Sequence, residues 1–317
     1  MVVPVPMLAV AGTAPDNPAW AIEMKFDGIR ALSICRSQRC RIYSRNRREI
    51  TSSFPEIAAA LTAQAGGREL ILDGEIIAPG LDGAPSFGLL QRRMHVTRPS
   101  RALIAAVPAQ LFLFDILADD GGDVTGLSYL DRRDRLQALG YTTAPVQTPP
   151  YWLGIEADRL LTAARDTGLE GIMSKRIDSR YTPGRRSPHW IKTPIRHRTE
   201  GIVAGWTTGT GAFASTFGGL VLAAHRPDGQ LVHIGNVGTG FTMAARRALR
   251  TRLDEIARTE PLFALTPGRV GAGAVHFVQP ILVGSVEYRE YSGGSLRHPS
   301  WKGLRTDIAA DEVEIPS

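Results

Sequence analysis

The segment around Lys25, with the sequence EMKFDGIR, carries the side chains best suited to covalent chemistry. In a strand, alternation places Glu23, Lys25 and Asp27 on one face, and Met24 and Phe26 on the other. A lysine is a nucleophile only after its ammonium group loses a proton, and neighbouring cations or partial burial lower its pKa toward that state. The pattern favours a nucleophilic Lys25 facing a polar site, although a surface strand ending in an Asp-Gly turn would look the same.

Four other charged side chains suit a phosphoryl-transfer site. Lys175 and Lys192 are candidate cations for the surroundings of Lys25 and for a phosphoryl group. Glu75 and Glu170 are candidate oxygen ligands for a hard cation such as Mg²⁺, or contacts for a ribose. Together with Lys25 they indicate a site that positions a phosphate and neutralises its charge.

Six short motifs occur along the chain in a definite order. They are KFDGIR (25–30), SRN (44–46), LDGE (72–75), FLFD (112–115), EGIMSK (170–175) and WIK (190–192). In type and order this set resembles the motifs of the covalent nucleotidyltransferases, the superfamily of DNA ligases, RNA ligases and messenger-RNA capping enzymes. The resemblance implies a nucleotide adduct on Lys25, with ATP as the nucleotide and Mg²⁺ or Mn²⁺ as the metal.

The same resemblance implies a role for each candidate side chain. Its catalytic residues are Lys25, Asp27, Lys175 and Lys192. Its nucleotide-binding residues are Glu23 at the exocyclic amine of adenine, Phe114 on the base, Arg30 and Glu75 at the ribose, and Lys175 and Lys192 at the α-phosphate. Its metal ligands are Glu75 and Glu170, and Arg45 would meet the 5′-phosphate of a nick.

Several of these positions have a structural alternative. Phe114 lies in an apolar run and could belong to the core. Asp73 and Asp115 could cap turns. Arg185 and Arg186 are interpreted as phosphate contacts, but a solvated loop would also carry them.

The C-terminal part of the chain narrows the resemblance. The segments GNVGTGF (235–241), YREY (288–291) and GSLRHPSWKGLRTD (294–307) resemble the closing OB-domain segment of bacterial ligase C and of the ligase module of ligase D. This implies a DNA ligase. A mobile basic domain could present Arg297, Lys302 and Arg305 to pyrophosphate during self-adenylylation and then grip DNA.

Two positions depart from the motifs of such ligases. Pro194 stands where a second lysine is usual two residues after Lys192, and Ile308 stands where the last motif ends in lysine. Both changes remove a phosphate-directed cation. We expect slow self-adenylylation unless Lys302 or one of the arginines at 196 and 198 takes over this role.

Hydrophobic periodicity predicts the strands and helices that would position these residues. Predicted strands are Trp20–Phe26, Ala31–Cys35, Arg41–Ser44, Leu70–Ala78, Leu111–Leu117, Gly171–Arg176, Trp190–Thr193, Gly201–Trp206, Gly218–His225, Leu231–Val237 and Pro280–Tyr288. Predicted helices are Pro55–Gln64, Ser86–Arg93, Tyr129–Leu139, Glu156–Thr167 and Met243–Ile256. Their order lacks a regular βαβ repeat, which predicts an α+β fold with antiparallel sheets.

A change of texture near Arg198 predicts two domains. Residues 1–197 form the expected adenylation domain. Residues 198–317 are rich in glycine and short strands with one helix, which fits a small Greek-key barrel of the OB type, although composition alone would also allow a sandwich. Because Lys25 is so near the start, we expect no separate DNA-binding domain ahead of it.

Composition limits the class of protein. The 317 residues are 43% hydrophobic and have a net charge of +6, which favours a globular protein with a polyanionic partner but also fits an ordinary basic enzyme. The sequence has neither a long apolar span nor a secretory leader, so we expect a cytoplasmic, nucleoid-associated protein with no membrane partner. Cys35 and Cys40 are interpreted as reduced cysteines without a role.

Three rival classes remain to be compared with a ligase that seals nicked double-stranded DNA. A capping guanylyltransferase would share the lysine motif but not the 297–307 segment. An NAD-dependent ligase needs a four-cysteine zinc module, which two cysteines cannot supply. A non-catalytic OB protein would not need the ordered motifs. The likeness to ligases C and D also suggests DNA repair or end joining, with a repair polymerase or a Ku-like end-binding protein as candidate partners.

Overall fold

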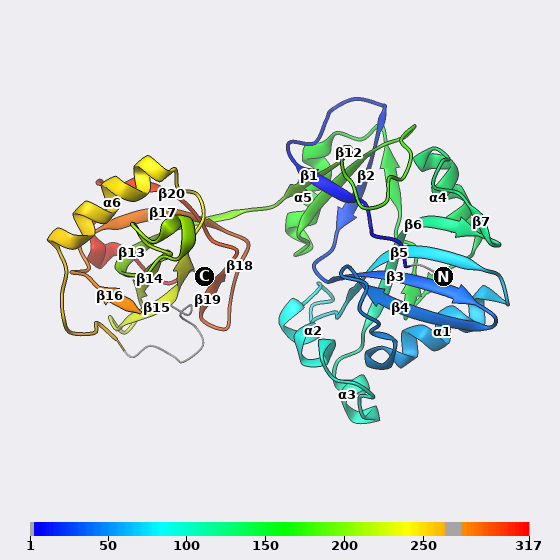
Figure 1. The fold of residues 1–317 in the computed structure, drawn as a ribbon, viewed down its shortest axis with the longest axis horizontal. Coiled ribbons are helices and arrows are strands. Elements are labelled where there is room, and N and C mark those ends of the chain that lie inside the picture. The colour runs from blue at the N-terminus through cyan, green and yellow to red at the C-terminus, as the bar shows by residue number, and fades with distance from the viewer. Residues whose placement is uncertain (1–2, 264–273, 317) are drawn as a thin grey trace. The chain divides into compact units, whose positions relative to one another are not determined.

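The chain consists of two compact units in the computed structural model, which describes residues 3–263 and 274–316. Contacts divide it into Met1–Ile195 and Arg196–Ser317 (Figure 1). None of the helices within these described ranges is long and apolar enough to cross a membrane.

One sheet of the first unit carries Lys25 at the end of a strand. Its strand order is β1 (Leu8–Ala11), β12 (Arg186–Pro194), β11 (Gly171–Arg176), β2 (Trp20–Lys25) and β10 (Tyr151–Leu153). The register sets Gly171 opposite Lys25 and Lys192 opposite Met173. The two lysines therefore reach the same sheet from strands on either side of β11.

The second sheet supplies the acidic and aromatic candidates. Its strand order is β4 (Arg39–Ser44), β3 (Ile29–Arg36), β5 (Leu70–Ile77), β6 (Gln110–Asp119), β9 (Val146–Gln147) and β8 (Thr142–Thr143), with β7 (Gly122–Asp123) beside β6. Along β5, Leu72 and Ile76 enter the larger hydrophobic core. Alternation therefore directs Asp73 and Glu75 to the opposite face of the sheet.

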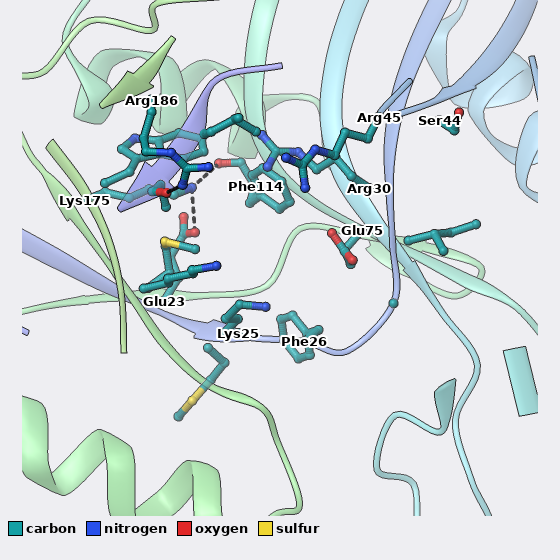
Figure 2. A pocket seen from close by; sticks show the side chains of 18 of the residues that line it. Glu23, Lys25, Phe26, Arg30, Ser44, Arg45, Glu75, Phe114, Lys175 and Arg186 are labelled. Atoms are coloured by element: carbon teal, nitrogen blue, oxygen red, sulfur yellow. Dashed lines mark hydrogen bonds and ion pairs between the residues drawn. The ribbon is translucent and has the colours of Figure 1, made fainter. Parts of the chain in front are cut away.

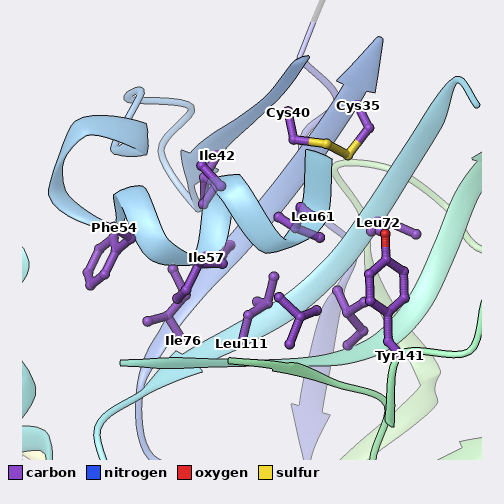
Figure 3. Close-up of a cluster of buried hydrophobic side chains, with 14 of the residues drawn as sticks. Cys35, Cys40, Ile42, Phe54, Ile57, Leu61, Leu72, Ile76, Leu111 and Tyr141 are labelled. Atoms are coloured by element: carbon purple, nitrogen blue, oxygen red, sulfur yellow. A yellow bond between two sulfur atoms is a disulfide. The ribbon is translucent and has the colours of Figure 1, made fainter. Parts of the chain in front are cut away.

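Helices α1 (Pro55–Ala65), α2 (Phe87–Met94) and α3 (Arg101–Ala106) pack on the outer face of the second sheet, and α5 (Ala157–Asp166) packs on that of the first. Helix α4 (Tyr129–Ala138) packs against β6 and reaches Glu23 of β2 through Tyr129. The 3₁₀ turn η1 (Thr51–Ser53) precedes α1. Helix α1 lays Ile57 and Leu61 over Leu72 and Leu111 of the second sheet (Figure 3). Helix α5 packs in the same way against β2 and β11. The site must then lie on the faces that the helices leave uncovered.

A third, smaller core lies between the two sheets. Met7, Leu32, Leu117, Tyr181 and Trp190 are buried there together. This core fixes the two inner faces relative to each other, so the residues that alternation places on them converge.

Two glycines of the motifs are required by close backbone contacts. A Cβ on Gly28 would lie 2.1 Å from the carbonyl oxygen of Ile76. Gly171 has a φ of +140°, and a Cβ there would lie 2.3 Å from the carbonyl oxygen of Thr193. Only glycine fits these positions without movement of the backbone. They bring β3 against β5 and β11 against β12 beside Lys25.

The second unit is built around one curved path of strands. The order is β15 (Leu231–Val237), β14 (Gly219–His225), β13 (His197–Thr207), β17 (Val283–Tyr288) and β20 (Ser300–Arg305), with β16 (Val275–Phe277) beside β13 and a hairpin of β18 (Glu290–Ser292) and β19 (Ser295–Arg297). The unit also contains η2 (Gly211–Phe213), α6 (Met243–Glu255) and η3 (Ala310–Glu312). Leu249 and Leu253 of α6 pack on this core, and Ile308 lies against it.

The predicted strands and helices are present, with ends that differ by a few residues. The sheets are mainly antiparallel, as predicted, and the pairs β1 with β12 and β6 with β9 are parallel. The interpretation of the cysteines as reduced is wrong. Cys35 and Cys40 are register partners across the β3–β4 hairpin and form a disulfide (Figure 3). Their spacing in the sequence does not reveal that a hairpin sets them face to face.

Candidate active site

A pocket of about 580 Å³ opens between the two sheets of the first unit (Figure 2). Its walls combine the first sheet, with Lys25, Lys175 and Lys192, and the second sheet, with Glu75 and Phe114. The six motifs thus meet in one cavity. The complete lining is Leu8, Ala9, Glu23, Met24, Lys25, Phe26, Gly28, Ile29, Arg30, Ser44, Arg45, Asn46, Glu75, Phe114, Met173, Lys175, Arg186, Trp190 and Lys192.

One end of the pocket is a cluster of lysines and carboxylates. Lys25 Nζ forms an ion pair with Glu170, and the backbone N–H of Glu170 donates to the carbonyl of Lys25 at 3.1 Å. Burial, together with the charge of Lys25, lowers the pKa of Lys192, while Glu170 opposes this shift. Lys192 and Lys25 are therefore close enough to repel each other, as a site for a phosphate requires.

Glu75 faces this cluster from the second sheet. Burial raises the pKa of its carboxyl to about 7, against the opposing effects of Lys25 and Arg30. The charge of Glu170 contributes to the rise. Glu75 and Lys25 thus line the same part of the pocket, and Glu170 pairs with Lys25 from outside the lining. Among the described residues, no three His, Cys, Asp or Glu side chains come together as a metal site.

Arg30 is held by a buried carboxylate. Its Nε and Nη2 each donate to Asp73 at 2.6 Å, and the hydroxyl of Tyr181 donates to the same carboxylate at 2.6 Å. The guanidinium lies 4.7 Å from the centre of the Phe114 ring. Asp73 is therefore an anchor for Arg30 and not a turn cap. Asp115 does not cap a turn either, because it pairs with Arg132 in the interior.

Phe114 lies on the face of β6 opposite to Leu111 and Leu113, which enter the larger hydrophobic core. The strand bulges at this residue, since Gly74 pairs with Leu113 and Asp73 pairs with Asp115, so Phe114 has no partner in the register. The bulge breaks the alternation of the strand, and Ile116 after it enters the same core as Leu113. Phe114 lines the pocket and is not confined to the core.

Lys175 lies at the aromatic end of the pocket and is only 1% exposed. Its Nζ lies 4.6 Å from the ring centre of Phe114, 5.1 Å from that of Tyr129 and 4.3 Å from that of Trp190. Burial lowers the pKa of Lys175, against the opposing effect of Glu23. Strand β11 carries Lys175 away from Lys25 toward the ring-lined end of the pocket, and its expected position beside the α-phosphate stays a prediction.

Glu23 joins Lys175 in a buried network. Its carboxylate lies 2.6 Å from Lys175 Nζ (Figure 2). It also accepts a 2.6 Å hydrogen bond from the hydroxyl of Tyr129. Arg133, from the same helix α4, lies 3.7 Å away. Glu23 is 6% exposed yet lines the cavity. The network fixes an acceptor carboxylate at the end of the pocket that holds Phe114.

Three predicted site residues of the first unit, Asp27, Glu170 and Arg185, are not part of the pocket lining. Arg186, and not Arg185, lines the pocket, together with Arg45. Asp27 is not part of the lining, whereas Phe26 is, since the chain leaves the strand after Lys25. Alternation stops predicting side-chain direction where a strand ends.

The basic candidates of the second unit are held by acidic neighbours of that unit. Arg297 pairs with Glu290 at 2.6 Å and Lys302 with Glu287 at 2.7 Å. Arg305 pairs with Glu200 at 2.8 Å and with Asp307 at 2.7 Å. Of the proposed substitutes for the missing lysines, Arg198 pairs with Glu287 and Arg196 donates to the carbonyl of His298.

Sequence reasoning missed the residues that support the site from outside the motifs. Tyr129, Arg132 and Arg133 come from α4, and Tyr181 comes from the segment before β12. One signal was available. The run Ser128-Tyr-Leu-Asp-Arg-Arg begins with a helix-capping serine, and the serine accepts from the N–H of Asp131. Two adjacent arginines on the inner side of so short a helix imply buried acceptors.

The first unit is an α+β domain whose pocket holds a lysine and carboxylates at one end and aromatic rings at the other. With a second unit of short strands after it, this is the arrangement of a nucleotidyltransferase with an OB-fold domain. The chain belongs to the ATP-dependent DNA ligase family. Residues 6–193 match the ATP dependent DNA ligase domain, and residues 213–308 match the ATP dependent DNA ligase C terminal region. The predicted family and fold class are confirmed.

Relatives with known names support the assignment. The chain is 38% identical over 314 residues to the multifunctional non-homologous end joining protein LigD of Mycolicibacterium smegmatis, covering 97% of this chain and 39% of that protein. It is 31% identical over 307 residues to a DNA ligase of Thermococcus onnurineus, covering 93% and 53%. The chain thus spans between about two fifths and about half of these proteins.

A solved structure covers almost the whole chain. A mycobacterial DNA ligase D complexed with ATP and MES shares 32% identity and has a TM-score of 0.56, with 98% of this chain and 97% of that chain covered. The match to the ATP-dependent DNA ligase family therefore extends over both units.

Proposed function

We propose that this chain seals nicks in double-stranded DNA through an adenylate on Lys25. Residues 1–197 act as the adenylation domain and residues 198–317 as the OB-fold domain. The observation that carries the proposal is the placement of Lys25 in the pocket beside Glu170, with Lys192 lining the same end and Phe114 and Trp190 lining the other. A nucleotide would suit both ends of the pocket, with its base at the end lined by aromatic rings and its phosphates at the end lined by lysines.

The reaction has three steps, and in each a nucleophile attacks a phosphorus atom and displaces a leaving group. Lys25 Nζ attacks the α-phosphorus of ATP, and pyrophosphate leaves. The 5′-phosphate of the nick then attacks the lysine adenylate, which frees Lys25 and leaves AMP joined to the DNA through a pyrophosphate bond. Finally the 3′-hydroxyl attacks that 5′-phosphate and AMP leaves. Lys192 and Arg186 neutralise charge on the phosphate in these transfers.

The proposed nucleophile, Lys25, forms an ion pair with Glu170, which is also a candidate metal ligand. A lysine that donates to a carboxylate is not ready to attack, so the pair must open first. Glu170 and Glu75 offer the oxygen donors that Mg²⁺ or Mn²⁺ prefers, and the small number of protein ligands fits a cation that keeps water and phosphate oxygens. A cation held by Glu170 and Glu75 would supply charge neutralisation at the α-phosphate.

The remaining nucleotide contacts follow from the two ends of the pocket. Phe114 stacks on adenine, and Glu23 accepts a hydrogen bond from the exocyclic amine. Arg30 and Glu75 hold the ribose between the two ends. Lys175 acts through Glu23, since it is buried against that carboxylate. Asp27 keeps the turn after Lys25 in place.

The DNA and pyrophosphate contacts are assigned to basic residues at the pocket mouth and in the second unit. Arg45 meets the 5′-phosphate of the nick, and Arg185 and Arg186 contact the phosphates near it. Arg297, Lys302 and Arg305 meet the pyrophosphate during adenylylation and contact DNA afterwards. Their present acidic partners are exchanged for phosphate in those steps.

A role in DNA repair or end joining is proposed from the relatives. A LigD protein named for non-homologous end joining matches nearly all of this chain. A repair polymerase or a Ku-like end-binding protein is the candidate partner, and the cytoplasmic nucleoid is the proposed place of action. Tethering of DNA ends by such a partner would raise the effective concentration of the nick.

Sealing of a labelled nicked duplex tests the proposal. We expect sealed product with ATP and Mg²⁺ from a nick bearing a 5′-phosphate, and none from a matched nick bearing a 5′-hydroxyl. GTP in place of ATP should give little product. Sealing that needs neither nucleotide nor 5′-phosphate would exclude this function.

A further inference from the structure

Five exposed arginines gather around η1, outside the pocket. They are Arg47, Arg48, Arg92, Arg98 and Arg101, which we call the arginine surface. Within residues 3–263 and 274–316, none of the five has an ion pair or a side-chain hydrogen bond. By contrast, the exposed arginines at 36, 68 and 159 of the same unit each pair with a carboxylate. The arginine surface therefore presents positive charge that the described chain does not neutralise.

Hydrogen bonds to backbone carbonyls of η1 hold the segments of the arginine surface together. The N–H of Arg98 donates to the carbonyl of Ser52 in η1 at 2.9 Å. Arg93, which follows Arg92 in α2, donates to the carbonyl of Ser53 at 2.6 Å. Arg48 lies three residues before η1 begins. The end of α2, the loop to α3 and the turn after β4 thus meet at one place on the unit.

Arg93 shows what a structural arginine looks like in the same segment. It is fully buried, pairs with Glu56 at 2.5 Å and donates to the carbonyl of Val107. The arginine surface has none of these features. Moreover, residues 83–114 contain no Asp or Glu. Uncompensated charges of one sign repel each other, so their concentration here is better explained by an anionic partner than by folding.

The arginine surface is continuous with the mouth of the pocket. Ser44 and Arg45 line the pocket, and the N–H of Arg47 donates to the carbonyl of Ser44 at 2.8 Å. Arg47 has a φ of +62° and Arg98 a φ of +54°, a backbone region that residues other than glycine seldom occupy. These turns direct the chain from the pocket wall toward α3.

The chemistry of the arginine surface favours a phosphate backbone over a protein. Thr97 and Ser100 lie between the arginines, and hydroxyl and guanidinium groups are the usual phosphate contacts. Val96, 36% exposed, is the single large hydrophobic side chain found exposed between residues 82 and 152. A protein interface would need an apolar centre.

We propose that the arginine surface binds duplex DNA beside the nick and sets much of the affinity for it, while the pocket performs the chemistry. This inference rests on the proposed nick-sealing function. It adds a second binding site whose loss should weaken the grip on DNA without affecting formation of the lysine adenylate.

The test compares two triple variants of equal charge change. One is Arg92→Gln with Arg98→Gln and Arg101→Gln. The matched control is Arg36→Gln with Arg68→Gln and Arg159→Gln, which removes exposed arginines that already pair with carboxylates. The affinity for a nicked duplex is measured by fluorescence anisotropy over a range of salt concentrations, and self-adenylylation with labelled ATP is measured in parallel.

Loss of three phosphate contacts should weaken binding by about tenfold or more near 0.1 M salt and reduce the slope of log K against log salt by about 2 to 3. The control should keep the slope of the wild type, and both variants should form the adenylate. A third variant with lysine at 92, 98 and 101 should restore most of the affinity, because the phosphates need only the positive charge. If the triple glutamine variant forms little lysine adenylate, its fold is in doubt and the three single variants take its place. Each of them is expected to reduce the slope of log K against log salt by about 1.

An unchanged affinity and slope in the triple glutamine variant would overturn the proposal, as would an effect confined to binding of an acidic protein. The two proposals can fail separately. If the wild type forms no adenylate, the proposed function is wrong, yet the affinity measurements still decide whether the arginine surface binds DNA.

Discussion

At the level of single residues, three cations that line the pocket are each paired with a carboxylate. Lys25 pairs with Glu170, Arg30 with Asp73, and Lys175 with Glu23. Each cation therefore has a defined direction before substrate binds. Such preorganisation is what a site needs to stabilise charge that develops during phosphoryl transfer.

Glu75 gives a prediction for stability against pH. Because its pKa is raised to about 7 in the folded protein and is about 4.5 in the unfolded chain, the folded state holds the proton more tightly. Stability from this group is fully present below pH 4.5 and is lost as the pH rises to about 7. The loss is at most about 3 kcal/mol. The melting temperatures of the wild type and of Glu75→Gln should therefore be compared over this pH window. As the pH rises through it, the wild type should lose stability relative to Glu75→Gln. A constant difference would show that Glu75 does not titrate in this way.

Tyr129 gives a prediction for nucleotide choice. Its hydroxyl donates to Glu23, and without it the carboxylate is held by Lys175 with less defined direction. Tyr129→Phe should raise KM for ATP in self-adenylylation by about tenfold, as expected for a lost hydrogen bond to a charged group, and should leave kcat nearly unchanged. Preference for ATP over GTP should fall. Tyr141→Phe is a matched control, since the hydroxyl of Tyr141 is buried but has no hydrogen-bond partner among the described residues. A fall in kcat alone would contradict a positioning role for Tyr129.

How much of the site the sequence predicts depends on the kind of contact. Strand alternation and its motif predict Lys25 on a polar face, and the motifs and residue types predict Glu75 and Lys192. The motif and charge of Lys175 predict a phosphate contact but not its surroundings. These surroundings are rings on β6, α4 and β12, which only the folded chain brings together.

At the level of elements, α4 and the bulge in β6 shape the aromatic end of the pocket. Arg132 of α4 and Asp115 of β6 are both completely buried, with Nε 2.7 Å from the carboxylate. This pair docks the helix that carries Tyr129. A buried pair of this kind is costly to break, because removal of one charge leaves the other without compensation.

Asp115→Asn should therefore destabilise the protein by about 3 to 5 kcal/mol, measured by urea unfolding. Asp178→Asn, which disrupts the exposed pair with Arg176, should change the free energy of unfolding little. Since the two substitutions are chemically the same, the comparison isolates burial. Equal effects of the two variants would show that the Arg132–Asp115 pair does not anchor α4.

The fold was predictable where a pattern is local. Strand β5 and helices α1 and α4 follow directly from periodicity and capping residues. Strand β1 was not predicted, because the proline-containing segment before it lacks alternation and pairs in parallel with β12, far along the chain. The bulge at Phe114 was also missed, since it depends on the register with β5 and not on the sequence of β6 alone.

For the molecule as a whole, Lys302 of the second unit is proposed to act in self-adenylylation much more than in the sealing of a pre-adenylated nick. Lys302 is 41% exposed and pairs with Glu287, which also binds Arg198. Their charges lower the pKa of Glu287, with hydrogen bonds from Lys302 and Arg198 as the main causes. A phosphate could replace this carboxylate as the partner of Lys302.

Lys302→Gln should slow self-adenylylation by about tenfold to a hundredfold and leave the sealing of a pre-adenylated nick much less affected. Arg226→Gln, at an exposed turn of the same unit, is the matched control. Single-turnover rates with ATP and with pre-adenylated nicked DNA separate the two steps. Equal slowing of both steps would indicate a general role of Lys302 in DNA binding.

The covalent intermediate can be observed directly by mass spectrometry. After incubation with ATP and Mg²⁺ and then proteolysis, the peptide containing Lys25 should carry the mass of AMP, and added nicked DNA should remove it. Lys25→Ala should show no adduct, whereas Lys192→Ala should retain Lys25 as the site of any residual label. An AMP adduct on another residue, or undiminished labelling of the Lys25→Ala protein, would show that Lys25 is not the nucleophile.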